Sequence, residues 1–226
     1  MKNNILVVVA HPDDEALGCG GTIAKHILKG DTVNLIVLSN GEDSRVNKKN
    51  LQNKIKLRNY ALQNSSKILG INKIFKFDFP DNKFDTIPLL DLIQTIEPLI
   101  KKIKPDIIYT HYINDLNIDH QIVALSINTI CRPSFIKKMP KKIYSFEILT
   151  STELNYTNLN QFNPNYFVDI TKTFKLKIKA IKQYKSEIMN FPNGRSIKGV
   201  EVLSNYRGLS CGFKNAEAFV LLKEIS

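Results

Sequence analysis

The stretch NILVVVAHPDDE, residues 4–15, joins an apolar run directly to a histidine, a proline and three acids. The run has no polar alternation, which is typical of a strand buried on both faces of a parallel sheet. Ligands of open α/β sheets bind outside the carboxyl ends of the strands, where these polar residues stand. Crowded acids at a buried strand end repel one another unless a cation or strong hydrogen bonds offset them. The alternative is a hydrogen-bonded turn that caps a helix.

Apolar runs and segments of helical periodicity alternate along the remainder of the chain. Expected strands cover residues 4–10, 32–38, 74–79, 106–110, 142–149 and 216–222. Expected helices cover residues 22–29, 48–69, 88–104, 121–131 and 171–184. This order predicts an α/β fold with a Rossmann-like, mostly parallel sheet and helices on both faces. We find no internal repeat or long linker, so we expect a single domain over residues 1–226.

The composition is that of an ordinary globular protein, with 226 residues, 43% of them hydrophobic and 23% charged. No apolar run approaches the roughly 18 to 20 residues of a membrane span, and the N-terminus does not resemble a signal peptide. The three cysteines are widely spaced and odd in number, which indicates a reducing cytoplasm. The sequence is compatible with a homo-oligomer but does not specify one.

The formal net charge of +11 raises the question of a polyanionic partner. The lysines are scattered over expected helix faces, and no nucleic-acid-binding motif accompanies them. We therefore expect a solvated basic surface and no nucleic-acid partner. A second interpretation of the charge is that it attracts an anionic small molecule.

A second polar cluster, HYINDLNIDH at residues 111–120, follows the expected strand at 106–110. Three of the four histidines of the chain lie in the two clusters. Histidine and carboxylate are the protein ligands of catalytic zinc sites, which keep three such ligands and one open position. We therefore predict one zinc ion per chain, bound by His11, Asp14 and His120, with His120 one strand end away from HPDDE in space.

The other polar residues of the clusters have separate expected roles. Asp13, beside Asp14, is the candidate general base for a water molecule activated by the metal. Asp119 is a candidate for orienting an imidazole of the site. Glu15 is expected to favour the positive end of the first helix, and His26 is expected to be structural.

Gly18, Gly20 and Gly21 raise a rival possibility, because a glycine-rich turn before a helix can bind phosphate. Their spacing fits neither of the common phosphate-binding motifs, and the preceding acids would repel an anion. We interpret them as positions of close backbone packing that precede the first helix. The competing class is a Rossmann-like nucleotide-binding module without hydrolytic activity.

The motif AHPDDEALGCGGTIA at residues 10–24 resembles the signature of the PIG-L / LmbE-like family of zinc-dependent N-deacetylases. Shorter segments in the same order strengthen the resemblance, among them SNGE at 39–42, FPD at 79–81 and KAIKQYKSE at 179–187. The resemblance implies the same metal ligands and the same base. It also implies removal of an acetyl group from an N-acetyl amino sugar or a related amide. The sugar could be free, nucleotide-linked, lipid-linked or part of a glycoside.

The resemblance also implies that Arg58 and Asp81 contact the substrate. Several family members have a histidine where this chain has Asn117, whose amide can hydrogen-bond an oxyanion but cannot supply a proton. Asp13 would then return the proton it took to the leaving amine. His111 is the other candidate for stabilising the oxyanion.

Overall fold

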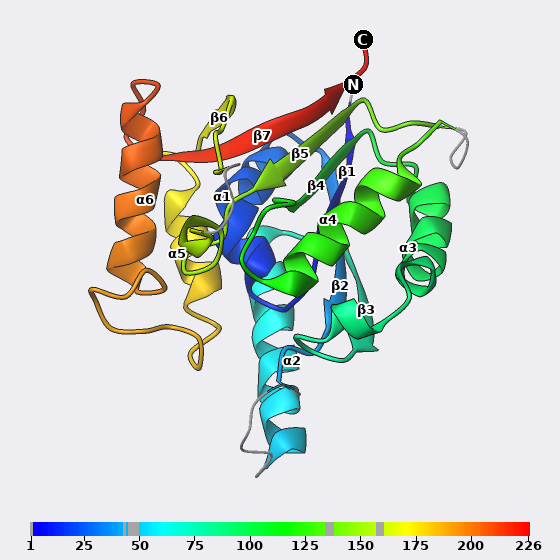
Figure 1. The fold of residues 1–226 in the computed structure, drawn as a ribbon. Coiled ribbons are helices and arrows are strands. Elements are labelled where there is room, and N and C mark those ends of the chain that lie inside the picture. The colour runs from blue at the N-terminus through cyan, green and yellow to red at the C-terminus, as the bar shows by residue number, and fades with distance from the viewer. Residues whose placement is uncertain (1, 43, 45–49, 134–137, 157–160) are drawn as a thin grey trace.

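The computed structural model describes residues 2–42, 44, 50–133, 138–156 and 161–226 (Figure 1). Among these residues, seven strands form one sheet in the order β3-β2-β1-β4-β5-β7-β6. The strands are β1 Asn4–Val9, β2 Thr32–Ser39, β3 Lys73–Phe79, β4 Ile107–His111, β5 Lys142–Phe146, β6 Tyr166–Asp169 and β7 Ala216–Glu224. Strands β1 to β5 are parallel, whereas β7 runs antiparallel between β5 and β6. The predicted mostly parallel sheet is therefore confirmed.

Helices cover both faces of this sheet, as predicted (Figure 1). They are α1 Asp14–Leu28, α2 Leu51–Leu69, α3 Leu89–Ile103, α4 Ile118–Ile130, α5 Phe174–Ile181 and α6 Ile197–Leu209, with short 3-10 helices η1 Phe84–Thr86 and η2 Thr152–Leu154. Helices α1, α2 and α5 pack on one face, and α3 and α4 pack on the other. Within the described part of the chain, no helix has the length and apolar character needed to span a bilayer.

Strand β1 explains why the opening apolar run lacks alternation. Val7 and Val9 point into the core beneath α1, and Leu6 and Val8 point into the core beneath α3 and α4. All four side chains are fully buried, because β1 is a central strand covered on both sides. An apolar residue is therefore required at every position from Ile5 to Val9, in line with the sequence prediction.

Several expected elements have different bounds. Helix α1 begins at Asp14, eight positions before the expected start at residue 22, so its three glycines lie inside the helix and do not precede it. Strand β5 ends at Phe146 and not at residue 149. Residues 48 and 49 of the expected second helix lie outside the described residues. Strand β6 and helix α6 were not expected from the sequence.

The glycines of α1 allow other elements to approach its backbone closely, as predicted. A Cβ atom at Gly18 would overlap the ring of Phe146 in β5. A Cβ atom at Gly21 would lie 2.8 Å from the side chain of Ile170, which follows β6. Glycine is therefore needed at Gly18 and Gly21 despite its low helix propensity, because a larger residue would separate α1 from the sheet.

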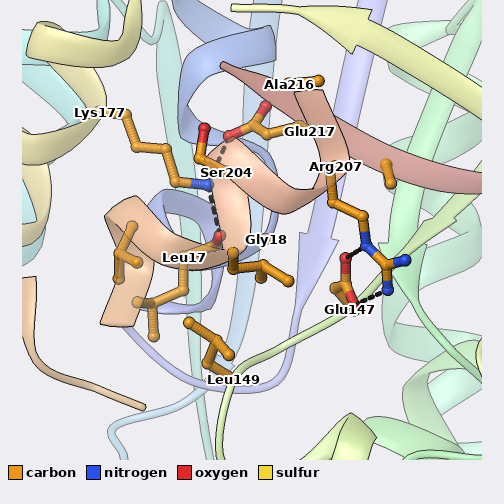
Figure 2. Close-up of a pocket in the computed structure, with 12 residues that line it drawn as sticks. Leu17, Gly18, Glu147, Leu149, Lys177, Ser204, Arg207, Ala216 and Glu217 are labelled. Carbon is orange, nitrogen blue, oxygen red and sulfur yellow. Dashed lines mark hydrogen bonds and ion pairs between the residues drawn. The ribbon is translucent and has the colours of Figure 1, made fainter. Parts of the chain in front are cut away.

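Helix α1 is kinked at Cys19, whose backbone angles of φ −144° and ψ 22° are not helical. A regular helix would pair the Leu17 carbonyl with the amide of Gly21. At the kink, the Leu17 carbonyl instead accepts a hydrogen bond of 2.7 Å from Lys177 Nζ of α5 (Figure 2). A charged side chain of another helix thus replaces a helix hydrogen bond.

The free amides on the other side of the kink bind Glu217 of β7. Gly21 N donates to Glu217 Oε1 at 2.9 Å, and Thr22 N donates to Oε2 at 2.7 Å. Lys177 Nζ in turn lies 2.6 Å from Glu217 Oε1, so a buried ion pair connects α5, β7 and both halves of α1 (Figure 2). This arrangement fixes the first half of α1, which carries Asp14 in its first turn.

Candidate active site

Strands β1 and β4 are parallel neighbours, so the two polar clusters that follow them meet at one edge of the sheet. His11 lies just beyond β1, and His120 lies in the first turn of α4, the helix that follows β4. The centroids of these two imidazole rings are 5.4 Å apart, although 109 positions separate the residues in sequence (120 − 11). The predicted closeness of the two clusters is confirmed.

His11, Asp14 and His120 form a buried group whose side chains could bind a metal ion. Asp14 Oδ2 lies 3.4 Å from His11 Nδ1 and 3.5 Å from His120 Nε2. Ligand atoms of a tetrahedral zinc site with bonds of about 2.0–2.1 Å are about 3.3 Å apart. Asp14 Oδ1 is buried without a hydrogen-bond partner among the described residues. The three side chains therefore fit a zinc ion in type and spacing, and Asp14 also keeps one oxygen, Oδ1, without a hydrogen-bond partner.

Each imidazole of the metal group has a second carboxylate on its other nitrogen. Asp119 Oδ2 lies 2.9 Å from His11 Nε2, and Asp115 Oδ1 lies 3.2 Å from His120 Nδ1. Such pairs fix the tautomer and the ring orientation of metal-binding histidines. Asp119 was predicted to orient an imidazole, whereas Asp115 was not predicted; its only signal in the sequence is its position in the same loop, five residues before His120.

The charges of the group depend on one another. Burial disfavours protonated His120, but Asp14 and Asp115 outweigh burial and raise its pKa to about 9. Burial also disfavours ionised Asp14, but His120 and His111 hold its pKa well below the usual range. The carboxylates therefore attract positive charge to this group. A bound cation and the imidazole protons would compete for the same ligand atoms.

His111, the last residue of β4, lies beneath the metal group and is fully buried. Its Nε2 accepts a hydrogen bond of 3.0 Å from Ala10 N and lies 3.4 Å from Asp14 Oδ2. Its ring stacks on that of His120 at 3.9 Å between centroids. Burial and the neighbouring His120 lower the pKa of His111 to about 4, which favours the neutral imidazole and agrees with the hydrogen bond that its Nε2 accepts.

Asp13 stands beside the metal group at the N-cap of α1, in an unusual backbone conformation with φ of +111°. Non-glycine residues rarely adopt this conformation, and such strain is concentrated at functional sites. Asp13 Oδ2 lies 3.0 Å from Arg195 Nη1 and 3.3 Å from Arg58 Nη2. Burial raises the pKa of Asp13, and the two arginines partly offset this effect.

Arg195, which precedes α6, was not predicted from the sequence as a site residue. Together with Arg58 it also contacts Glu187: Arg195 Nη1 lies 3.6 Å from Glu187 Oε2, and Arg58 Nη1 forms a short ion pair with Glu187 Oε1. Two cations thus face two anions, Asp13 and Glu187, at this side of the site. Arg58 therefore already pairs with two acids of the protein, Asp13 and Glu187.

A cavity of about 130 Å³ opens beside these groups. His11, Asp13, Arg58, Asp81, Asn117 and Arg195 are among its lining residues. The cavity therefore brings together the predicted base, the predicted substrate-binding pair and one predicted metal ligand. The described residues that line it include Asn117 but not His111.

Asn117 and Asp81 have defined positions on the wall of this cavity. Asn117 Oδ1 caps α4 by accepting a hydrogen bond of 2.8 Å from Asp119 N, which leaves its amide group to donate. That group donates to Asn82 Oδ1 at 3.1 Å. Asp81 Oδ1 lies 3.1 Å from His11 Nε2, and its Oδ2 accepts from Ser44 Oγ at 2.5 Å. Asp81 therefore contacts a predicted metal ligand as well as the cavity.

Glu15 lies in the first turn of α1, as expected, but it also has a second role. It is fully buried, and its Oε1 accepts hydrogen bonds from Tyr184 Oη at 2.6 Å and Ser65 Oγ at 2.9 Å. Burial raises its pKa to about 7. Glu15 therefore ties α1 to α2 and to the segment after α5. His26 bonds Asp31 at 2.7 Å, in keeping with a structural role.

The fold and site together define an α/β protein with a histidine–aspartate–histidine group that could hold a metal ion, and a buried carboxylate beside it, at the carboxyl edge of a mostly parallel sheet. The model of the PIG-L family, described as GlcNAc-PI de-N-acetylase, matches residues 6–131. The match spans more than half of the chain and includes both polar clusters. The chain belongs to the PIG-L family.

Curated relatives and solved structures agree with this assignment. The "uncharacterized deacetylase YaiS" of Escherichia coli is 29% identical over 82% of this chain and 92% of its own. The diacetylchitobiose deacetylase of Thermococcus kodakarensis is 27% identical over 81% of this chain and 69% of its own. The structure of N,N'-diacetylchitobiose deacetylase from Pyrococcus horikoshii has the same fold, with a TM-score of 0.78 and 20% identity over 96% of this chain and 83% of that one.

Proposed function

We propose that this chain is a zinc-dependent hydrolase that removes the acetyl group from an N-acetyl amino sugar, of the N-acetylglucosamine type, or from a related small amide. The observation that carries the proposal is the convergence of His11, Asp14 and His120, with an unpaired oxygen on Asp14, beside the carboxylate of Asp13. The names of the curated relatives, which are deacetylases, support the reaction class.

The metal would be held by His11, Asp14 and His120. When bound, zinc supplies Lewis acidity toward an amide carbonyl and makes a water molecule more acidic. Asp13 lines the cavity and accepts a proton from that water, whose oxygen then forms a bond to the carbonyl carbon. Asp119 and Asp115 hold the two imidazoles in orientation throughout.

The oxyanion that develops on the carbonyl oxygen, as the water oxygen bonds to the carbonyl carbon, needs a hydrogen-bond donor. The amide group of Asn117 faces the cavity and can donate, whereas His111 Nε2 is an acceptor in its contact with Ala10 N. We therefore assign this role to Asn117. Because an amide cannot supply a proton, Asp13 returns its proton to the nitrogen as the C–N bond breaks. The products are acetate and the free amine.

The cavity suggests the nature of the substrate. Its walls carry carboxylate, amide and guanidinium groups, which can hydrogen-bond the hydroxyl groups of a sugar. Arg195, with 23% of its side chain exposed, stands where it can attract an anionic conjugate.

The three cysteines, Cys19, Cys131 and Cys211, are unpaired, which supports a reducing cytoplasmic compartment.

Acetate release from a panel of N-acetyl sugars tests this proposal. The panel should include free N-acetylglucosamine, its UDP conjugate, a lipid-linked form and a simple glycoside. We expect acetate from at least one of them, loss of activity after chelation, and recovery with one equivalent of zinc. Binding of nucleotide-linked sugars without acetate release from any of the substrates, in protein loaded with zinc, would instead favour the nucleotide-binding module.

A further inference from the structure

A second cavity lies at the opposite edge of the sheet from the candidate active site. It is lined by residues at the start of β4 and β5, such as Ile107 and Lys142, and by the last turns of α1. Its volume of about 420 Å³ exceeds the 130 Å³ of the candidate active site. Pockets for small organic ligands measure about 300–1,000 Å³, so this cavity has room for one.

Aromatic rings form one wall of this second cavity. Tyr109 and Tyr144 stack with ring centroids 5.2 Å apart and an angle of 16°, and Tyr166 lies 4.6 Å from Tyr144. Tyr109 and Tyr144 are almost completely buried, whereas Tyr166 in β6 is 36% exposed. The buried pair thus supports an accessible ring, on which a flat ligand can stack.

Lysine side chains line the cavity beside these rings. Lys25 Nζ donates to the Asp169 carbonyl at 2.7 Å, and Lys142 Nζ pairs with Glu224 at 2.7 Å. Lys29 and Lys141 are exposed, and among the described residues their ammonium groups form no hydrogen bond or ion pair, although Lys141 lies near enough to Asp106 to act on it electrostatically. Two ammonium groups therefore remain available beside the aromatic wall.

The acids near this cavity offset only part of its charge, since Glu224 pairs with Lys142 and Asp106 pairs with Lys138, which is not a lining residue. Asp31 is the one carboxylate among the described lining residues, and its oxygens already accept from Asn3 N at 2.8 Å and contact His26 at 2.7 Å. Four lysines line the cavity; Lys142 is offset by Glu224, which leaves three lysines and the single lining acid Asp31. Its net charge has the sign of the whole chain, +11, and favours an anion.

We infer that this second cavity binds a small phosphate ester with a planar ring, of the size of a nucleoside monophosphate. The ring stacks against Tyr166, and the phosphate lies between Lys29 and Lys141. Lysine ammonium groups bind phosphate as point charges, and tyrosine faces accept planar rings without regard to their substituents. The two features together select for a molecule that carries both groups.

Calorimetric titration with adenosine 5'-monophosphate tests this inference on the full chain. We expect saturable binding of the nucleotide and at least tenfold weaker binding of adenosine and of inorganic phosphate, because each lacks one of the two groups. The Lys29→Gln/Lys141→Gln variant should bind the nucleotide at least tenfold more weakly. Tyr166→Ala should also weaken it, since the stacked ring is lost.

Two controls locate the binding. Lys67→Gln/Lys102→Gln removes two exposed lysines outside this cavity and should bind as the wild type does. Arg195→Gln should also bind normally, because Arg195 lines the other cavity. Absence of saturable binding, equal binding by the Lys29→Gln/Lys141→Gln variant, or equal affinity for inorganic phosphate would each overturn the inference.

Discussion

Arg195 Nη1 lies 3.0 Å from Asp13 Oδ2, although 182 positions separate the two residues in sequence. Asp13 belongs to the segment matched by the family model, residues 6–131, whereas Arg195 lies beyond it. Burial raises the pKa of Asp13, while Arg58 and Arg195 act in the opposite direction. The C-terminal part of the chain therefore adjusts the strength of the proposed base.

Replacing Arg195 with glutamine should shift the pH dependence of deacetylation. Removing a cation raises the pKa of a nearby carboxylate, so Asp13 would become an active base only at higher pH. We expect the acid limb of kcat/KM to move upward by about 1 pH unit, since that is the usual effect of one close opposite charge. Arg195→Lys keeps the charge and should move the limb less. An unchanged acid limb in Arg195→Gln would contradict this role.

Replacing Asp115 with asparagine should weaken metal binding. Asp115 contacts His120 Nδ1 and is held by Ser151 and Thr152, so an asparagine would keep part of the structure but lose the charge. Loss of such an outer carboxylate lowers metal affinity by about 10–100-fold. Competition with a zinc chelator measures the change. Asp85→Asn, at an exposed position, is the matched control and should bind zinc normally; equal affinities in the two variants would argue against this role.

The kink of α1 should depend on the buried pair of Lys177 and Glu217. Lys177→Met leaves Glu217 without its cation and the Leu17 carbonyl without its donor. Removal of one partner from a buried pair costs about 3–5 kcal/mol in the free energy of unfolding. Urea denaturation should detect this loss. Lys198→Met, which breaks the exposed pair with Glu201, should cost less than about 1 kcal/mol, and a similar cost for both variants would contradict the structural role.

Glu15 should make stability depend on pH. Its pKa of about 7 in the folded chain exceeds the ordinary value of 4.5, so the folded state binds this proton more tightly than the unfolded state. The Glu15 contribution to stability is therefore present below pH 4.5 and is lost as the pH rises through 7.

Glu15→Gln removes this titration. Between pH 4.5 and 7, the free energy of unfolding of the metal-free variant should rise relative to the wild type, by up to about 3 kcal/mol from the pKa difference. Urea denaturation at several pH values measures this change. A difference between the two proteins that stays constant over the range would show that Glu15 does not titrate as proposed.

The sequence predicted those features that depend on local chemistry and strand order. Complete burial of β1 requires an unbroken apolar run, and parallel neighbours place the clusters of His11 and His120 at one edge. The start of α1 was misjudged because glycine disfavours helices in isolation. Here the kink is stabilised by Lys177 and Glu217, which lie more than 150 positions away in sequence. Only the folded chain reveals such partners.

The same limit applies to residues around the site. Asn117 could be singled out because several members of the family have a histidine at this position. Its place on the cavity wall is compatible with the expected hydrogen bond to an oxyanion. Arg195 and Asp115 have no local pattern that distinguishes them from solvated surface charges. Their proposed roles rest on the short distances from Arg195 to Asp13 and from Asp115 to His120. The spacing of these residues in the sequence does not predict those distances.

The most direct test of the proposed chemistry measures zinc content and acetate release together in two variants. Asp13→Asn should retain one zinc ion per chain and lose turnover by about 10²–10⁴-fold, as expected when a general base is removed. His120→Ala should lose the metal itself, and its activity with it. Normal acetate release by Asp13→Asn, or stoichiometric zinc in His120→Ala, would contradict the account.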